Sequence, residues 1–490
     1  PPRFIEYNLW LALETAVPLW ASGQPATPLT YWPEGPPESG GICLYQGQVK
    51  DLTTQLDQIP VGAMITAIPR PNQAYWTLSA LWAGWLWGRE AIGPFVKVLR
   101  RRRYDWAWHT AALYSPLRRL ANRLPPQTPF FGMITENEAG FDAAAMVAAD
   151  LADFQLEGVA LRVKESQTHI LWRHTEERPE SPERQPVSSV TTAIQYTIAA
   201  RGEPTPYLHL QAAALHALSL ENALSAPGLD PQAPRTAQAH TAYTNTRQLL
   251  ADTLAPSGPF VRYQGGKSSI EIGKWWPKAA IETEQPLADR VEMAVVNLFQ
   301  AVNALPHAEI DTTLCNQFPG LQTPDASLLQ AILNSYAEES QPGHWSLREN
   351  DTAAARRADV AEMFRLLEKT GSELGFTVRR ENALIWENAQ DGQPLYFYVI
   401  ASSILGRIIH AAQHRPEQGV IVLPGSRAGL VMHKRERDPR LDYQLEGGWR
   451  FLKFRYVRRL AESERISPEN LASHFALDPL SHEEAQLPLL

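Results

Sequence analysis

Short apolar segments alternate with helical segments along the first third of the chain, and this alternation constrains the fold more than any other feature. Segments 62–68 and 129–135 are continuously apolar, too short for ordinary helices and typical of buried strands. Segment 75–88, which follows the first of them, is expected to be a helix that ends at a glycine. The order predicts an α/β fold with a mostly parallel sheet covered on both faces. Segments 158–163 and 169–173 are expected to form a hairpin at the end of this sheet.

Breaks in composition divide the chain into three predicted regions. A charged, proline-rich stretch at 174–189 has the composition of a linker, and a second boundary falls at 338–351. The sequence therefore predicts an α/β domain at 1–175, a helical linker region at 176–340 and a C-terminal α+β domain at 341–490.

The end of the middle region has a helix, a short extended piece and a second helix that opens at Thr323-Pro324-Asp325. This order resembles a winged-helix unit. A plain helical spacer is the alternative that the same residues allow.

Charge and cysteine content limit the partners of the chain. The 490 residues carry a net charge of −8, so contact with nucleic acid must come from local basic patches. Cys43 and Cys315 are far apart and no CxxC pair occurs, which argues against a structural zinc site and suits a reducing cytoplasm. No apolar run reaches about 18 residues and no signal peptide opens the chain, so we expect a cytoplasmic protein without a transmembrane helix.

The loop after the 62–68 strand carries the strongest functional signal. It reads Ile65-Thr66-Ala67-Ile68-Pro69-Arg70-Pro71-Asn72-Gln73-Ala74-Tyr75 and continues into a tryptophan-rich helix. Open α/β sheets bind ligands at the carboxyl ends of their strands, where this loop is expected to lie.

The loop, its helix and the downstream run 104–134 resemble, in order and pattern, the DNA amino-methyltransferases, in particular putative adenine-specific DNA methylases. These enzymes carry a [DNS]-P-P-[YFW] loop at the end of a strand in a Rossmann-like sheet. Over the first third of the chain, the resemblance implies a Rossmann-like methyltransferase domain and S-adenosylmethionine as methyl donor. In the family, the Asp or Asn and a proline carbonyl accept the two hydrogens of the base amine, and the aromatic residue stacks on the flipped base.

The loop departs from the family pattern at the positions that carry the chemistry. The family's Asp aligns with Ala67, the first proline with Ile68 and the aromatic residue with Arg70, while Pro69 is kept. An alanine side chain accepts no hydrogen bond, and arginine can bind phosphate but only donates. If activity survives, the resemblance assigns the catalytic positions to Pro69, Asn72 and Tyr75.

The expected cofactor site is also incomplete. The resemblance points to Gln48 and Asp51 near the cofactor, where the family usually has an acid. The Asp-Pro-Phe-x-Gly-x-Gly turn that lets the backbone approach S-adenosylmethionine is absent. Two readings stay open: a degenerate methyltransferase fold kept as a scaffold, or a methyltransferase whose cofactor turn lies upstream of Pro1.

Two basic patches are candidates for DNA contact. Four consecutive arginines precede the helix at 105–124, and the segment 427–459 holds ten Lys or Arg residues against four acids, with aromatic residues interleaved. Solvated charge clusters and ion pairs on a core are the alternatives. With Arg70, the predicted nucleic-acid-binding residues are Arg100, Arg101, Arg102, Arg103, Arg427, Lys434, Lys453 and Arg455.

Two further features have structural interpretations. Trp76, Trp82, Trp85 and Trp87 are expected to be mainly core and helix-packing residues. The 353–426 order weakly resembles restriction-endonuclease-like folds, but Glu387 is the one carboxylate on its two central strands, so a magnesium site would be empty. The sequence thus predicts a DNA methylase-like protein that has lost or nearly lost methyl transfer, or a non-catalytic scaffold that binds DNA or a protein partner.

Overall fold

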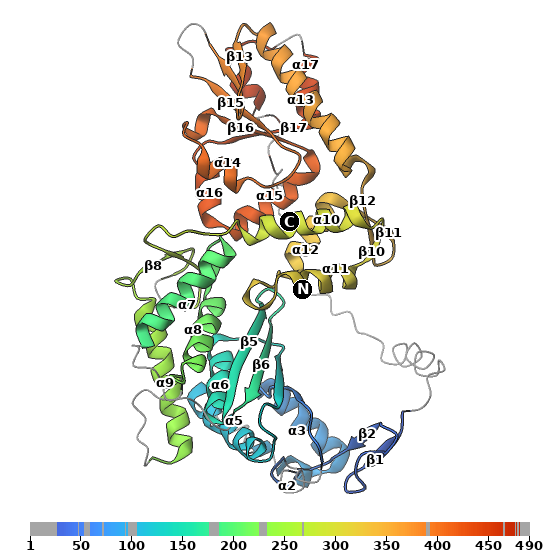
Figure 1. The fold of residues 1–490 in the computed structure, drawn as a ribbon, viewed down its shortest axis with the longest axis vertical. Helices are drawn as coiled ribbons and strands as arrows, with labels where there is room; N and C mark the ends of the chain where they lie inside the picture. Colours follow the sequence, from blue (N-terminus) through green and yellow to red (C-terminus); the bar gives the residue numbers. More distant parts are fainter. Residues whose placement is uncertain are drawn as a thin grey trace. The chain divides into compact units, whose positions relative to one another are not determined.

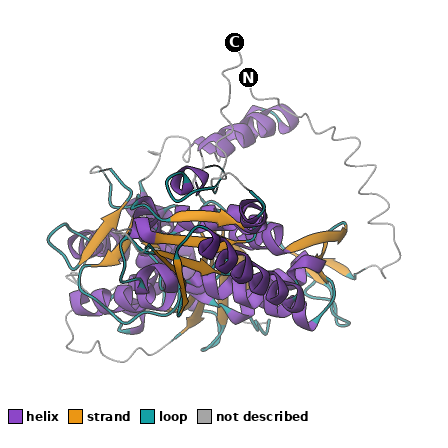
Figure 2. Ribbon diagram, turned by 90° about the horizontal axis from the view of Figure 1, so that it is seen from above, coloured by secondary structure: helices purple, strands orange, loops and turns teal. Residues whose placement is uncertain are grey.

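A computed structural model of the chain describes residues 27–47, 49–52, 59–70, 73–93, 95–96, 105–175, 186–224, 233–266, 269–388, 393–463, 466–475, 477 and 480, with the backbone alone at 50 and 73–76. The chain divides into two compact units between Val61 and Gly62. In the first unit, β1 (Leu29–Tyr31) and β2 (Ile42–Leu44) pair in parallel, and α2 (Val49–Leu52) follows (Figure 1). Helices make up much of the second unit, whose strands form several small sheets, so the fold is mixed α/β (Figure 2).

The first sheet of the second unit has four strands in the order β3 (Met64–Ala67), β4 (Pro129–Ile134), β6 (Gln167–His174) and β5 (Phe154–Arg162). β3 and β4 are parallel, whereas β4 pairs with β6, and β6 with β5, in antiparallel register. The predicted hairpin at the end of the sheet is therefore confirmed. Among the described strands the sheet is mixed rather than mostly parallel, because the hairpin supplies two of its three pairings.

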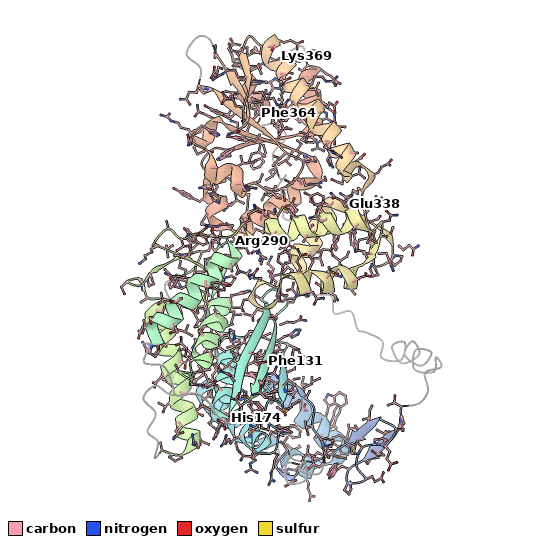
Figure 3. All side chains as sticks on the ribbon, in the orientation of Figure 1. Phe131, His174, Arg290, Glu338, Phe364 and Lys369 are labelled. Carbon is pink, nitrogen blue, oxygen red and sulfur yellow. The ribbon has the colours of Figure 1, made fainter. Side chains whose placement is uncertain are left out.

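Large aromatic side chains fill one face of this sheet. Phe130 on β4 and Trp172 on β6 are fully buried and stack with ring centroids 4.6 Å apart. Gly132 lies two residues after Phe130 on β4, and a Cβ there would meet the Trp172 ring at 2.5 Å, so this close approach requires glycine. Figure 3 labels Phe131 and His174, which belong to these same two strands.

The sheet is covered by helices that precede the predicted linker at 174–189 in the sequence and by helices that follow it. α6 (Ala139–Leu151) is buried along its whole length, as its apolar, alanine-rich sequence requires. Ser219 on α8 (Tyr207–Leu220) donates to Asp150 at 2.6 Å and accepts from the Leu156 amide at 2.9 Å, which joins α8 to α6 and β5. α5 (Trp106–Ala121) and α9 (Arg235–Thr253) also pack against each other. Elements after residue 186 therefore belong to the same packed core as residues 105–175.

The middle of the chain uses one element order twice: helix, short strand, two helices and a hairpin. The two sheets have the same strand order, and the short strands pair alike, Thr205 with Trp275 and Leu305 with Trp345. The sequence had no detectable repeat, because the likeness lies in topology and register. The first copy is α7 (Pro186–Arg201), β7 (Thr205–Pro206), α8, α9, β8 (Phe260–Tyr263) and β9 (Lys274–Pro277). The second is α10 (Leu287–Ala301), β10 (Leu305–Pro306), α11 (His307–Gln317), α12 (Ala326–Tyr336), β11 (Ala337–Gln341) and β12 (His344–Leu347).

A five-stranded mixed sheet forms the core of the C-terminal part. Its strands follow chain order, with antiparallel pairs first and parallel pairs from β15 onward. β16 is completely buried because its five residues, GVIVL, are all apolar. The strands are β13 (Thr377–Arg380), β14 (Leu384–Glu387), β15 (Leu395–Val399), β16 (Gly419–Leu423) and β17 (Arg450–Lys453). The helices are α13 (Ala353–Glu373), α14 (Gly406–Ala411), α15 (Ala428–Arg437), α16 (Pro439–Glu446), α17 (Phe454–Ala461) and α18 (Leu471–Phe475).

Candidate functional site

The loop that resembles the methyltransferase motif leaves the carboxyl end of β3. The Ile68 amide donates to the Met133 carbonyl at 2.9 Å, which continues the β3–β4 pairing by one residue. Pro69 follows, and its carbonyl oxygen lies 3.1 Å from Nε2 of His109 on α5. A carbonyl oxygen only accepts, so Nε2 of His109 carries the proton in this contact. Burial lowers the pKa of His109 to about 4, although the Pro69 bond opposes the shift, so the imidazole is neutral near pH 7.

Arg70, the next residue, is bound by two carboxylates. Its guanidinium lies 2.6 Å from Glu136 and 2.6 Å from Glu138, and its Cζ is 6.0 Å from the centre of the Trp106 ring. Two carboxylates on one guanidinium leave no net positive charge at this position. Arg70 therefore links the loop after β3 to the loop after β4 through ion pairs. The sequence had led us to expect a phosphate contact at this residue instead.

Asp142, in the first turn of α6, is a buried acid beside these ion pairs. Its Oδ2 accepts from the Thr168 hydroxyl at 2.9 Å, and its Oδ1 lies 3.4 Å from the Glu138 amide. Burial raises the pKa of Asp142 to about 7, with a smaller contribution from the Glu138 carboxylate, while its two hydrogen bonds oppose the shift. The site therefore holds a carboxyl group that titrates near neutral pH.

The local sequence explains why these side chains meet. Asp105 caps α5 by accepting from the Trp108 amide at 3.1 Å, and this fixes where the helix begins. Trp106 then stacks on Phe141 with ring centroids 5.5 Å apart. Gly140 allows this contact, because a Cβ there would lie 2.1 Å from the Trp106 ring. The packing places His109, one turn further along α5, over the Pro69 carbonyl.

Several predicted site residues lie outside the described residues or away from this site. Gln48, Asn72 and Arg100–Arg103 are outside the described residues, as is the side chain of Tyr75, whose backbone lies in the first turn of α3 (Gln73–Trp87). Asp51 is exposed on α2, in the other compact unit. Of the predicted catalytic, cofactor-binding and DNA-binding residues, Pro69 and Arg70 are the two that the described residues place at this site.

Three of the four residues in the C-terminal basic patch that were predicted to bind DNA are buried. Arg427 is fully buried, contacts Asp351, and stacks over the Tyr336 ring with its Cζ 3.3 Å from the centroid. Lys434 contacts Asp289 and Glu292, and Lys453 is also buried. A buried cation cannot reach a phosphate, so the structure contradicts the expected DNA contacts of Arg427, Lys434 and Lys453. Arg455, on α17, is exposed.

In both repeated helical units the third helix packs against other parts of the chain, although α9 keeps one exposed face. In a helix-turn-helix, the second helix of the motif enters the major groove. The corresponding helices here are α9, which packs on α5 and α6, and α12, which packs on α15. In the second unit, the Ser335 hydroxyl of α12 donates to the Ser426 carbonyl at 3.0 Å. Both helices therefore join parts of the chain.

The tryptophans of α3 are the largest departure from the expected packing. Trp82, Trp85 and Trp87 are 57%, 84% and 75% exposed, so the prediction that they are core residues is wrong. The side chain of Trp76 lies outside the described residues. Sequence pattern alone identifies an apolar stripe but not whether anything covers it.

A second polar cluster lies in a cavity of about 270 Å³ between the β5–β6 hairpin and α11. Arg162 lies 2.6 Å from Asp311 and 3.1 Å from the Cys315 sulfur. Burial raises the pKa of the Cys315 thiol, and Asp311 adds to the shift although Arg162 opposes it. A thiol with a raised pKa is a poor nucleophile at neutral pH, so this cluster does not have the properties of a cysteine active site.

The sequence has no Asp-Pro-Phe-x-Gly-x-Gly turn with which to hold S-adenosylmethionine. The family holds this cofactor at a glycine turn where the backbone approaches the ligand. Glu387, the carboxylate considered for a nuclease-like magnesium site, is bound by Arg379.

Sequence reasoning missed His109, Glu136, Glu138 and Asp142. The sequence could have pointed to Asp142, because an acidic residue inside the alanine-rich run of α6 is expected to be buried and therefore to need a hydrogen-bond partner. No such signal existed for His109, whose role depends on how α5 packs across the loop.

Within the described ranges, no group of three or more His, Cys, Asp or Glu side chains could hold a metal ion. No helix in the same ranges is long and apolar enough to cross a membrane. A scan against protein-family models, a search of curated proteins and a search of solved structures each find no match to this chain.

Proposed function

We propose that this chain is a DNA methylase-like protein that has lost methyl transfer and serves as an interaction scaffold. Its first sheet would descend from a Rossmann-like methyltransferase domain. The observation that carries the proposal is the loop at the carboxyl end of β3, where Ala67, Pro69 and Arg70 occupy the positions of the catalytic motif. We call this loop closed because His109 binds the Pro69 carbonyl and two glutamates bind Arg70.

The position of the loop supports kinship with the methyltransferases. β3 and β4 are parallel, and helices α3 and α5 lie between them in the chain, as in a β-α-β crossover. The loop leaves β3 at the edge where such sheets bind ligands. The terminal hairpin also agrees with the element order expected for this region.

The contacts of the loop argue against methyl transfer. The base amine needs two acceptors, and Ala67 supplies none through its side chain. The Pro69 carbonyl already accepts from His109 at 3.1 Å. Arg70 occupies the position of the stacking aromatic residue, and Glu136 and Glu138 hold its guanidinium. An amine that enters this loop would find no side-chain acceptor at position 67, and it would have to share the Pro69 carbonyl with His109.

A methyl-transfer assay tests the proposal. The full chain is incubated with methyl-tritiated S-adenosylmethionine and duplex DNA that contains adenine and cytosine, beside an active adenine methyltransferase as positive control. We expect no incorporation above a reaction without protein. Time-dependent incorporation that rises with the concentration of the protein would contradict the proposed loss of activity.

DNA binding is the second candidate function, and exposed arginines on α17 favour it. Arg455 and Arg459 are both exposed and lie one helical turn apart. The two repeated units have the element order of winged helices. α12 is largely covered, whereas α9 packs on α5 and α6 and keeps one face exposed.

We expect Arg455→Ala combined with Arg459→Ala to weaken duplex affinity about equally for different sequences. If both arginines bind phosphates, the slope of log affinity against log salt should fall by about 2. Fluorescence anisotropy at several salt concentrations measures this slope. The matched control is Lys369→Ala, an exposed cation on α13, which should leave the slope unchanged. Unchanged binding in the double variant would remove this candidate.

A further inference from the structure

The apolar stripe of α3 is exposed to solvent. Leu78, Leu81, Trp82, Trp85 and Leu86 recur at the i, i+3, i+4, i+7, i+8 spacing of a core-facing helix surface. We call these five residues the α3 stripe. Each is between 56% and 84% exposed.

The small residues of α3 face inward instead. Ala80 and Ala83 are buried. A Cβ at Gly84 would lie 2.7 Å from the side chain of Ile92, so the inner face packs closely on the following short helix, Arg89–Ile92. The exposed face thus has the large side chains that normally fill a core, and the orientation of the helix is fixed by close packing on its other side.

The extent of the α3 stripe matches what an interface requires. A large aromatic side chain buries about 150–250 Å². At the observed exposures, the five side chains present on the order of 600–700 Å², above the roughly 300–600 Å² of the largest apolar patch on a typical monomer. Trp87, exposed at the end of the helix, enlarges the patch further. The total approaches the roughly 800 Å² per partner of a standard interface.

The charge of α3 indicates which partner fits. Residues 71–88 contain no Asp, Glu, Lys or Arg. In a two-fold symmetric interface, the same patch meets itself, so any charge near the axis would face its own copy. An uncharged stripe avoids this repulsion. Trp82 and Trp85 already meet edge to face, with ring centroids 5.7 Å apart, and they can form the aromatic anchor of such an interface.

We propose that the α3 stripe is a self-association surface, on which α3 of a second copy of this chain packs. The proposal names the partner of the scaffold function and rests on it. The two tests fail separately, because the methyl-transfer assay does not depend on oligomeric state.

Sedimentation velocity over a range of concentrations tests the proposal on the full chain. We expect a monomer–dimer equilibrium that Trp85→Glu weakens at least about thirty-fold, the effect of losing a central aromatic anchor and placing like charges face to face. Because Trp85 is 84% exposed, the substitution should leave the thermal unfolding temperature unchanged at concentrations where both proteins are monomeric. Leu81→Glu provides a second variant on the same stripe.

Two comparisons separate this surface from other causes of association. Tyr443→Glu is the matched control, since Tyr443 is 79% exposed on α16, away from the stripe. It should leave the dimer intact. Association through an uncharged surface should also persist from 0.1 to 1 M NaCl. A chain that stays monomeric at all concentrations, or a dimer that survives both Trp85→Glu and Leu81→Glu, would overturn the proposal.

Discussion

Replacing Lys434 by methionine should destabilise the second unit by about 3–5 kcal/mol at pH 7.5, because it leaves two buried carboxylates without their cation. Lys434 is buried on α15 and contacts Asp289 and Glu292 on α10. Burial by itself would lower the pKa of Lys434, but the two carboxylates outweigh it and the pKa is raised. Lys434 also donates to the Ser403 carbonyl at 3.2 Å, so its loss removes one of the links between α15 and the segment after β15.

Chemical denaturation followed by intrinsic tryptophan fluorescence measures this effect. The loss should shrink toward pH 5, where Asp289 and Glu292 can take up protons in the variant. Lys369→Met is the matched control, because the exposed pair of Lys369 with Glu373 at 3.6 Å contributes little. Combining Lys434→Met with Asp289→Asn and Glu292→Gln should recover much of the loss. Equal midpoints for Lys434→Met and the wild type would contradict the buried network.

Replacing Asp142 by asparagine should change how stability depends on pH. The folded-state pKa of Asp142 is raised to about 7 from an ordinary value of 3.8, so the folded chain binds this proton more tightly than the unfolded chain. Stability from this group is present below about pH 4 and is lost as the pH rises to about 7. Asparagine does not titrate, so the gap between variant and wild type should move in favour of the variant by about 4 kcal/mol from pH 4 to pH 8.

Urea denaturation at intervals of one pH unit gives this gap. Taking the difference between the free energies of unfolding of the two proteins removes the contributions of all titrating groups that they share. A gap that is constant across the range would mean that Asp142 is ionised and solvated in the folded chain, contrary to its burial beside Thr168 and Glu138.

The sequence predicted the elements around the candidate site better than their contacts. The spacing of the apolar residues and the lengths of the apolar runs identified β3, β4 and the terminal hairpin, because strand formation depends on such local runs. The expected helix at 105–124 became α5 (Trp106–Ala121), whose cap at Asp105 is a local signal. The His109–Pro69 contact joins residues forty positions apart, and no local pattern encodes it.

Charge was the least reliable guide. The segment 427–459 was predicted to be a solvent-facing basic patch. Arg427 and Lys434 instead pair with Asp351, Asp289 and Glu292, which lie far away in the sequence. A count of charges within one segment cannot reveal partners that another segment supplies. For the tryptophans of α3 the error was the opposite one: they were predicted to be buried but are exposed. The spacing of apolar residues does not show whether another part of the same chain covers them.

A nitrogen-15 NMR titration of His109 tests the central claim, that the loop at the end of β3 is closed, most directly. The full chain is labelled selectively at histidine, and the His109→Gln variant assigns the resonance. A closed loop predicts a neutral imidazole with the proton on Nε2, hydrogen-bonded to Pro69, down to a pKa of about 4. Titration near pH 6.5 with rapid exchange of that proton would contradict the account, because it would leave the Pro69 carbonyl open to a substrate amine.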